Sequence, residues 1–563
     1  MKTWIVLSVI LVSACSKRQP LYFNEQSESS IACTPETVEV EPNKLRRLTK
    51  REFARSLPIL FGSSIASAIS AQLSIVPAEP TDVGFDTQDN SVELIHVESM
   101  NTVAESIANL IVDQQPAFLS IGTCLGGTPA TQRPCFQKFI SALGYRLFRK
   151  PVDQATLDRY MSAYDAQAAE ARADVAKLLI SAMLQSPQFY YVLELDGQAV
   201  DGSEELLALS EFEIATRLAL VYTGALPDIT LLEEARLGRL ASAEQIEAQA
   251  RRLLESSLGR SHMQDYVVQY LRLDTLPRFS YSPEFLKGIR TDALDVAMKN
   301  EILSLMDHLI FETDAGFKEL MTTNVSFVKD PQLAAIYGIS MPAEPSGRTV
   351  LADSSRRGLL TRAALLASGN DATNPFHRGK LVLSNFFCSS AGRPDPETLP
   401  DAFATTPDEG TTSTRHRLET LTSSNVCMAC HARINPLGFA LEEFDSLGRY
   451  RTSETLINQK TGAETVFPID ARTTLTLNQN VHQINGAAGL SQVLAAGTIG
   501  ADCFARKWYR FARGTKEHAG REACTIERLA KTSVSSEKGL KKMLIEFSRL
   551  PQFRLKSNSE GAK

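Results

Sequence analysis

The stretch Cys427-Met428-Ala429-Cys430-His431 is the most informative part of this chain of 563 residues. The spacing C-x-x-C-H is the attachment signature of a c-type haem, because two thiols one helical turn apart can each bond to a haem vinyl group and the next imidazole can coordinate the iron. With 9 cysteines and 8 histidines in the chain, chance produces such a pentapeptide in only roughly two chains per thousand. The stretch therefore predicts one covalent haem c, held by Cys427 and Cys430, with His431 as the proximal iron ligand.

Three other interpretations of the two cysteines are open. A thioredoxin-like redox pair is expected within a βαβ unit, and half of a zinc site is expected beside a second Cys/His pair. Neither context is visible in the sequence around Cys427. The third alternative is a structural disulfide between Cys427 and Cys430 without a metal.

The sixth ligand of the iron would decide the function. A methionine or histidine at that position gives an electron-transfer centre, whereas an open position lets peroxide or another small molecule bind. The next methionine after the motif is Met543, far along the chain. His377 and His482 are the distal candidates, and the alternative for each is a histidine at the surface or in a hydrogen-bonded loop.

Three arginines follow the motif: Arg433, Arg449 and Arg451. A guanidinium group matches a carboxylate in shape and charge, so these side chains are candidates to bind the two haem propionates. The alternative is pairing with the carboxylates of the same segment: Glu442, Glu443 and Asp445. The two roles do not exclude each other. Gly438 and Gly448 are expected where backbones approach closely or where φ is positive.

The N-terminus indicates export, which agrees with a haem that is attached outside the cytoplasm. Lys2 precedes an apolar run from Trp4 to Val12 that is too short to span a bilayer as a helix. The run leads into Val12-Ser13-Ala14-Cys15, which is similar to the cleavage box of bacterial lipoproteins, so Cys15 is the expected lipidation site. An ordinary secretory signal is the alternative. We therefore expect a lipid-anchored protein of the cell envelope, at the outer membrane and facing the periplasm or the cell surface.

The remaining cysteines are expected to form disulfides in an oxidising compartment. Proximity in the sequence favours Cys124–Cys135 and Cys503–Cys524, each beside a predicted helix. Cys33–Cys388 is then the pair left by elimination.

Length and patterning predict several domains built mainly from α-helix, with few short strands. Apolar residues recur at helical spacing over 135–149, and capping boxes occur at Thr49/Glu52 and Ser210/Glu213. A short strand is predicted at 465–468. The expected division is a signal peptide over 1–15, a flexible tether over 16–42, helical domains over 43–118, 119–198 and 199–330, a haem-motif domain over 345–455, and a C-terminal helical domain over 456–563.

One tripeptide ends two predicted helices. It occurs as Pro187-Gln188-Phe189 and again as Pro551-Gln552-Phe553. Two copies are too few for a repeat architecture, so we interpret the tripeptide as a shared device for stopping a helix.

The segment from the haem motif through Asn435-Pro436-Leu437-Gly438-Phe439 to Gly448-Arg449-Tyr450-Arg451 resembles the planctomycete-type cytochrome c family, large exported proteins with several domains of unknown function. Further matches occur in the family's order along the chain: Arg47-Leu48-Thr49, Gly84-Phe85-Asp86, Phe148-Arg149-Lys150-Pro151, Ser186-Pro187-Gln188-Phe189, Leu226-Pro227-Asp228, Arg357-Gly358-Leu359-Leu360-Thr361 and Arg378-Gly379-Lys380. The resemblance covers most of the chain from Leu45 to Arg554. It implies an architecture and a haem cofactor, and leaves the reaction open.

Two positions depart from the family's pattern. Asn435 stands where the family usually has aspartate, and Arg513-Gly514-Thr515 stands where the family has a Gly-Arg pair. The first departure affects any role that would need a carboxylate one turn after His431.

Three functions are consistent with these patterns. The leading hypothesis is a lipid-anchored c-type haem protein that passes electrons to or from a protein partner. The second is a five-coordinate haem peroxidase or oxidase, and the third is a cell-surface binding scaffold with accessory or no haem. A net charge of −6 argues against nucleic acid as a partner. The sequence holds no G-x-S-x-G, H-E-x-x-H, P-loop or G-x-G-x-x-G motif, and no catalytic residue is assigned.

Overall fold

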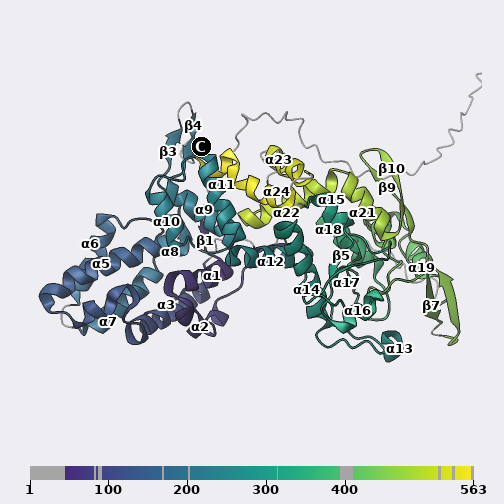
Figure 1. Cartoon of the computed structure of the whole chain (residues 1–563), viewed down its shortest axis with the longest axis horizontal. Helices are drawn as coiled ribbons and strands as arrows, with labels where there is room; N and C mark the ends of the chain where they lie inside the picture. The colour runs from purple at the N-terminus through teal and green to yellow at the C-terminus, as the bar shows by residue number, and fades with distance from the viewer. Residues whose placement is uncertain are drawn as a thin grey trace, which may run out of the picture.

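The protein is mainly α-helical, as the sequence predicts. The computed structural model describes residues 45–80, 84–86, 92–167, 170–200, 203–313, 315–392, 410–458, 460–517, 522–535 and 539–558. Within these residues there are 25 α-helices and short strands of up to 6 residues. In Figure 1 helices α1 to α8 lie at the left, α13 to α19 lie at the right, and α22 to α24 lie between them. No helix in this part of the chain is long and apolar enough to cross a membrane.

The first hydrophobic core is built by the N-terminal helices. They are α1 (Lys50–Phe61), α2 (Ser63–Ala68), α3 (Leu94–Gln114), α4 (Ile121–Gly126), α5 (Pro129–Leu147), α6 (Gln154–Ala166), α7 (Arg172–Leu184) and α8 (Pro187–Tyr190). The predicted capping box opens α1, where Thr49 Oγ1 accepts from the Glu52 N–H at 3.1 Å and Glu52 Oε2 accepts from the Thr49 N–H at 2.9 Å. The apolar stripe predicted over 135–149 is buried on α5. The expected domains 43–118 and 119–198 both supply side chains to this core.

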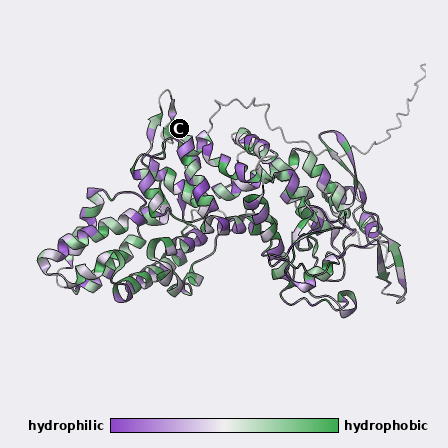
Figure 2. Ribbon diagram, in the orientation of Figure 1, coloured by the Kyte–Doolittle hydropathy of each residue, from purple (hydrophilic) through white to green (hydrophobic). Residues whose placement is uncertain are grey.

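The second core is larger and contains the C-x-x-C-H segment. Its helices are α9 (Glu211–Thr223), α10 (Ile229–Arg236), α11 (Ala243–Glu255), α12 (Ser257–Leu271), α13 (Pro283–Leu286), α14 (Leu294–Asp307), α15 (Phe317–Thr322), α16 (Pro331–Tyr337), α17 (Ala363–Leu366), α18 (Pro375–Phe386), α20 (Asn425–Phe439), α21 (Gly486–Ala496), α22 (Ile499–Arg513), α23 (Ala523–Ser533), α24 (Gly539–Arg549) and α25 (Pro551–Arg554). Helix α19 (Thr414–Leu421) precedes α20, and its buried residue Leu418 is not part of this core. The second predicted capping box is present, since Ser210 and Glu213 exchange hydrogen bonds at the start of α9. Figure 2 shows hydrophilic and hydrophobic residues alternating along the helices, as expected when one face of each helix is buried. Side chains from the expected ranges 199–330, 345–455 and 456–563 all belong to this one core.

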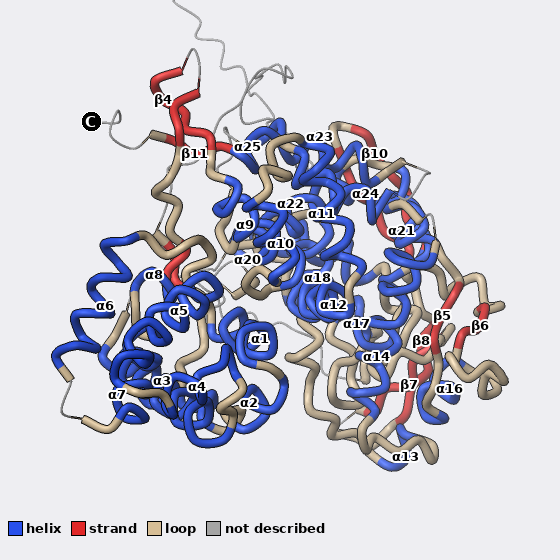
Figure 3. The backbone as a smooth tube through the Cα atoms, turned by 60° about the vertical axis from the view of Figure 1, so that its left-hand side comes forward, coloured by secondary structure: helices blue, strands red, loops and turns tan. Residues whose placement is uncertain are grey.

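The strands form small antiparallel sheets, most of them at the edges of the helical body (Figure 3). They are β1 (Arg46–Arg47), β2 (Tyr191–Val192), β3 (Gln198–Val200), β4 (Ser203–Ala208), β5 (Val325–Phe327), β6 (Arg348–Val350), β7 (Ser453–Ile457), β8 (Glu464–Pro468), β9 (Arg472–Leu477), β10 (Asn480–Asn485) and β11 (Leu555–Ser557). The pairs are β1 with β2, β4 with both β3 and β11, β5 with β6, β7 with β8, and β9 with β10. The strand predicted at 465–468 is confirmed as β8, which pairs with β7 in the register Ser453 to Pro468.

Two arginines hold the two Pro-Gln-Phe turns in the same way. In the first copy Arg149 donates to the carbonyl oxygens of Gln188, Phe189 and Tyr191, at 2.8, 3.0 and 2.8 Å. In the second copy Arg217 donates to the carbonyl oxygens of Gln552, Phe553 and Leu555, at 3.2, 3.0 and 3.1 Å. Carbonyls that a helix end leaves without partners must be satisfied when they are buried. Each tripeptide therefore begins a one-turn helix, α8 or α25, with the proline in its first turn, and an arginine satisfies the carbonyls at the end of that helix.

The disulfides differ in part from those expected. Cys124–Cys135 is confirmed, with Cα atoms 5.2 Å apart. The pairings Cys503–Cys524 and Cys33–Cys388 are wrong, because Cys388 is bonded to Cys503. Helix α22 packs against α18, which brings Cys503 on α22 to Cys388, just beyond the end of α18. Cys524 is also in a disulfide, and Cys33 lies outside the described residues.

Candidate functional site

The C-x-x-C-H motif occupies the first two turns of α20. Ser424 caps this helix, since its Oγ accepts a hydrogen bond from the Cys427 N–H at 3.2 Å. Residues three positions apart lie on the same face of a helix, so Cys427 and Cys430 face the same side. Both are half-buried free thiols, so the disulfide between them, one of the alternatives, is not formed. His431 follows directly and is also half-buried.

Two side chains hold the imidazole of His431. The ring of Phe376, from the first turn of α18, packs edge-on with its centroid 4.3 Å from that of His431. Nδ1 of His431 lies 2.9 Å from Oδ1 of Asn435, one turn further along α20. Asn435 is buried and donates from Nδ2 to Thr422 Oγ1 at 2.9 Å. The ring is therefore fixed through Nδ1, and Nε2 is the nitrogen left to bind a metal.

Helices α18 and α20 cross with their backbones in contact beneath the motif. A Cβ atom on Gly379 would lie 2.2 Å from the carbonyl oxygen of Ile434, and one on Gly438 would lie 2.0 Å from that of Pro375. Only glycine fits at such distances. The close approach expected at Gly438 is confirmed, and Gly448 has the expected positive φ of 91°. This crossing is what brings Phe376 to His431.

The Cys388–Cys503 disulfide secures the segment that covers the motif. Just beyond Cys388, Ser389 accepts a hydrogen bond from Arg433, and the carbonyl oxygen of Ala391 accepts one from the Cys430 thiol at 2.7 Å. The disulfide thus joins α22, near the end of the chain, to residues that contact α20.

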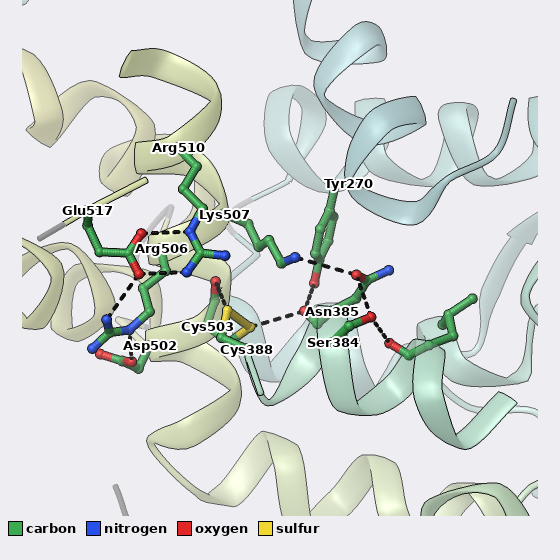
Figure 4. The surroundings of a disulfide bond; sticks show 11 residues. Tyr270, Ser384, Asn385, Cys388, Asp502, Cys503, Arg506, Lys507, Arg510 and Glu517 are labelled. Carbon is green, nitrogen blue, oxygen red and sulfur yellow. Dashed lines mark hydrogen bonds and ion pairs between the residues drawn. A yellow bond between two sulfur atoms is a disulfide. The ribbon is translucent and has the colours of Figure 1, made fainter. Parts of the chain in front are cut away.

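Polar groups converge on Asn385 beside this disulfide (Figure 4). The Tyr270 hydroxyl donates to the Asn385 carbonyl oxygen at 3.2 Å, and Lys507 Nζ lies 3.5 Å from Asn385 Oδ1. Burial lowers the pKa of Lys507 to about 8. Further out, Glu517 accepts from Arg510 at 2.6 Å. The disulfide therefore lies within a polar cluster that connects α12, α18 and α22.

Arg378 anchors the turn that follows α20. Its guanidinium group is fully buried. It donates to Glu442 Oε1 at 3.1 Å and to the backbone carbonyl oxygens of this turn and of α17: Leu441, Phe444, Asp445 and Leu366. This satisfies buried carbonyls of the turn that follows α20 and explains why an arginine precedes Gly379 in the crossing helix.

The three arginines expected near the haem propionates are placed differently. Arg449 pairs with Asp445 at 2.6 Å, and Arg451 pairs with Glu442 at 3.1 Å, so the structural role considered for them is present. Arg433 is half-buried on α20, one turn from Cys430, with its guanidinium group at Ser389. Of the three, Arg433 is the one that lies on the motif helix itself.

The distal candidates lie in two different places. His377 is exposed in the first turn of α18, directly after Phe376. His482 is on β10, where it lines an open cavity of about 730 Å³ with residues of α21. Met543 is buried on α24 in the second core. Among the residues that the structure describes, no group of three or more His, Cys, Asp or Glu side chains is arranged to hold a metal ion.

The predicted lipidation site lies outside the described residues. Cys15, the signal peptide over 1–15 and the tether over 16–42 all precede Leu45, where the description begins. The lipid anchor therefore stays a prediction.

Sequence reasoning singled out Asn435 only as a departure from the family's pattern, and it did not foresee which residues position His431. Asn435 stands four residues after His431 on the same helix, and this spacing was a usable signal for a contact. Phe376 and Thr422 come from other elements, and nothing in their sequence context points to the motif. Ser389 and Ala391 were missed because their position depends on the Cys388–Cys503 disulfide.

The fold and the site define a class of mainly helical protein whose C-x-x-C-H helix is packed into a large core. Family models match three parts of the chain: PSD5, a protein of unknown function (DUF1595), over residues 135–194; PSD4, a protein of unknown function (DUF1592), over 209–339; and PSCyt3, a protein of unknown function (DUF1588), over 356–454. These are the domains associated with planctomycete-type cytochromes c, so the resemblance is confirmed at the level of domains. No curated protein and no solved structure matches the chain.

Proposed function

We propose that this protein is an exported c-type haem protein that transfers electrons to or from a protein partner. Cys427 and Cys430 would hold the haem through thioether bonds, and His431 would bind the iron. The observation that carries the proposal is the state of the thiols. Both motif cysteines are free on one face of α20, whereas the other cysteines of the described residues are all in disulfides.

The surroundings of the motif fit such a group. His431 is already oriented, with Nδ1 engaged by Asn435 at 2.9 Å and its ring packed against Phe376. Arg433 offers a guanidinium group on the same helix for a propionate. A bound haem supplies reversible one-electron chemistry, which the protein tunes through ligation, hydrogen bonding and burial.

Electron transfer requires a fixed iron ligand and an edge that a partner can reach. Cys427, Cys430 and His431 are only half-buried, and Val426 beside them is 44% exposed. An exposed apolar side chain next to a redox centre suits a protein contact that forms and dissociates quickly. These features favour electron exchange across the start of α20.

The test is covalent haem attachment. We would express the full chain with cytochrome c maturation machinery and stain a denaturing gel for haem. The proposal predicts a stained band for the natural protein and none for Cys427→Ser with Cys430→Ser. The matched control, Cys124→Ser with Cys135→Ser, also removes two cysteines and should keep its stain. An unstained natural protein would end the proposal.

A second candidate function is a five-coordinate haem enzyme that acts on peroxide or a small molecule. It is favoured by the burial of Met543, the only methionine after His431, in the second core. The ferric absorption spectrum separates the two candidates. A low-spin spectrum supports electron transfer, whereas a high-spin spectrum that shifts on addition of peroxide supports the enzyme.

We further propose that Cys15 carries lipid and anchors the protein at the outer membrane. The proposal rests on the lipoprotein-like box that ends at Cys15 and on the polar composition of residues 16–42. Acyl chains contribute about 0.8 kcal/mol for each buried methylene. Natural protein should therefore fractionate with membranes and Cys15→Ala should not; equal fractionation of the two would contradict the anchor.

A further inference from the structure

The hydrogen bonds around Asn435 have a fixed direction. The Thr422 hydroxyl donates to the carbonyl oxygen of Leu418 at 2.8 Å. A hydroxyl has a single proton, and a carbonyl oxygen can only accept, so Thr422 Oγ1 must accept from Asn435. The amide therefore turns Nδ2 toward Thr422, at 2.9 Å, and Oδ1 toward His431, at 2.9 Å.

This direction fixes the tautomer of His431. Oδ1 of Asn435 can only accept, so the proton of the neutral imidazole is on Nδ1. The lone pair is then on Nε2, the nitrogen through which His431 would bind iron. Asn435 and Thr422 are only 7% and 3% exposed, so water competes little for these bonds.

We propose that Asn435 is a positioning residue that sets the reduction potential of the haem bound to His431. The inference rests on the proposed haem attachment. A hydrogen bond from the distant ring nitrogen makes an imidazole a stronger donor to its metal, and a charged acceptor strengthens this effect. The neutral amide of Asn435 therefore orients the ring while leaving it a weaker electron donor than a carboxylate would.

A purely structural role makes a different prediction. If Asn435 served only to link α20 to Thr422, Asn435→Leu would leave the haem potential unchanged, and Asn435→Asp would lower it only through its added charge. If it positions and tunes His431, a carboxylate and an apolar side chain should move the potential in opposite directions.

The experiment compares four forms of the full chain carrying haem: the natural protein, Asn435→Asp, Asn435→Leu and Asn425→Asp. Asn425 is exposed at the start of α20, so its substitution controls for an added charge on the same helix. Haem staining of a denaturing gel reports attachment, and a spectroscopic redox titration reports the midpoint potential. We expect all four forms to stain. The potential should fall in Asn435→Asp, rise in Asn435→Leu and change least in Asn425→Asp.

The outcomes separate the two proposals. Normal staining with the natural potential in both Asn435 variants would overturn the role of Asn435 and leave haem attachment standing. An unstained natural protein would overturn both. If Asn435→Leu does not fold, Thr422→Val removes the group that orients the amide. Thr422→Val should raise the midpoint potential above that of the natural protein. An unchanged potential would count against the inference.

Discussion

The cysteines within the described residues form two groups, those bonded in disulfides and those that are free thiols. Cys124–Cys135 joins α4 to α5, and Cys388–Cys503 joins the end of α18 to α22, with Cα atoms 5.2 Å apart in each pair. Cys427 and Cys430 instead share the first turns of α20 and are free thiols. The bonded pairs depend on how separate segments pack, whereas the free pair depends on the geometry of one helix. The comparison separates cysteines that stabilise the fold from cysteines available for chemistry.

The largest loss of stability is expected when the disulfide that closes the longest loop is removed. Replacing Cys388 and Cys503 with serine opens a loop with a sequence separation of 115. Loop-closure entropy then lowers the free energy of unfolding of the second core by about 5 kcal/mol. The chain has 2 tryptophans, and Trp508 is the one within the described residues. Because it is buried in the second core, its fluorescence in a denaturant titration reports this change; an unmoved transition would contradict the disulfide.

A smaller effect is expected from Cys124→Ser with Cys135→Ser. This pair closes a sequence separation of 11, and the same entropy relation gives about 3 kcal/mol. The loss should fall on the first core, so hydrogen exchange of α3 and α5 should speed up while the Trp508 transition stays in place. If the exchange rates of α3 and α5 and the Trp508 transition both changed, the two cores would unfold as one unit.

The free pair depends on the crossing of α18 and α20, which Gly438→Ala would disturb. The added methyl group meets a carbonyl oxygen, so we expect a loss of about 1–3 kcal/mol in the second core, read from Trp508 fluorescence. The control is Gly489→Ala in α21, where the nearest atom would be 3.6 Å away. That variant should stay within about 1 kcal/mol of the natural protein. Equal stability of Gly438→Ala and the control would argue against the close crossing.

The smallest effect is expected for the motif cysteines in protein produced without haem. Cys427→Ser with Cys430→Ser breaks no disulfide, and both side chains are half-buried. The free energy of unfolding should therefore change by no more than about 0.5 kcal/mol, although the same variant should lose all covalent haem. A large loss of stability would place Cys427 and Cys430 in the structural group.

Local features of this fold could be predicted from the sequence, and features that depend on packing could not. Capping boxes at Thr49 and Ser210, the buried stripe of α5 and the helical context of the motif follow from short-range spacing. The pairing of Cys388 with Cys503 depends on which face α22 turns toward α18, and proximity in the sequence carries no information about that face.

The candidate site shows the same division. Cys427, Cys430 and His431 could be identified from one pentapeptide, because one turn of helix sets their relation. Phe376 and Thr422 reach His431 and Asn435 from α18 and from the end of α19, so only the folded chain brings them together. Arg449 and Arg451 were candidates for a haem propionate, and nearby carboxylates of their own segment pair with both.

The state of every cysteine in one sample tests the central claim most directly. Natural protein matured with haem would be alkylated without reduction, digested and analysed by mass spectrometry. We predict a peptide with haem bonded to both Cys427 and Cys430, together with Cys124 linked to Cys135 and Cys388 linked to Cys503. Alkylated motif cysteines, or a disulfide between Cys427 and Cys430, would contradict the assignment of this pair to haem.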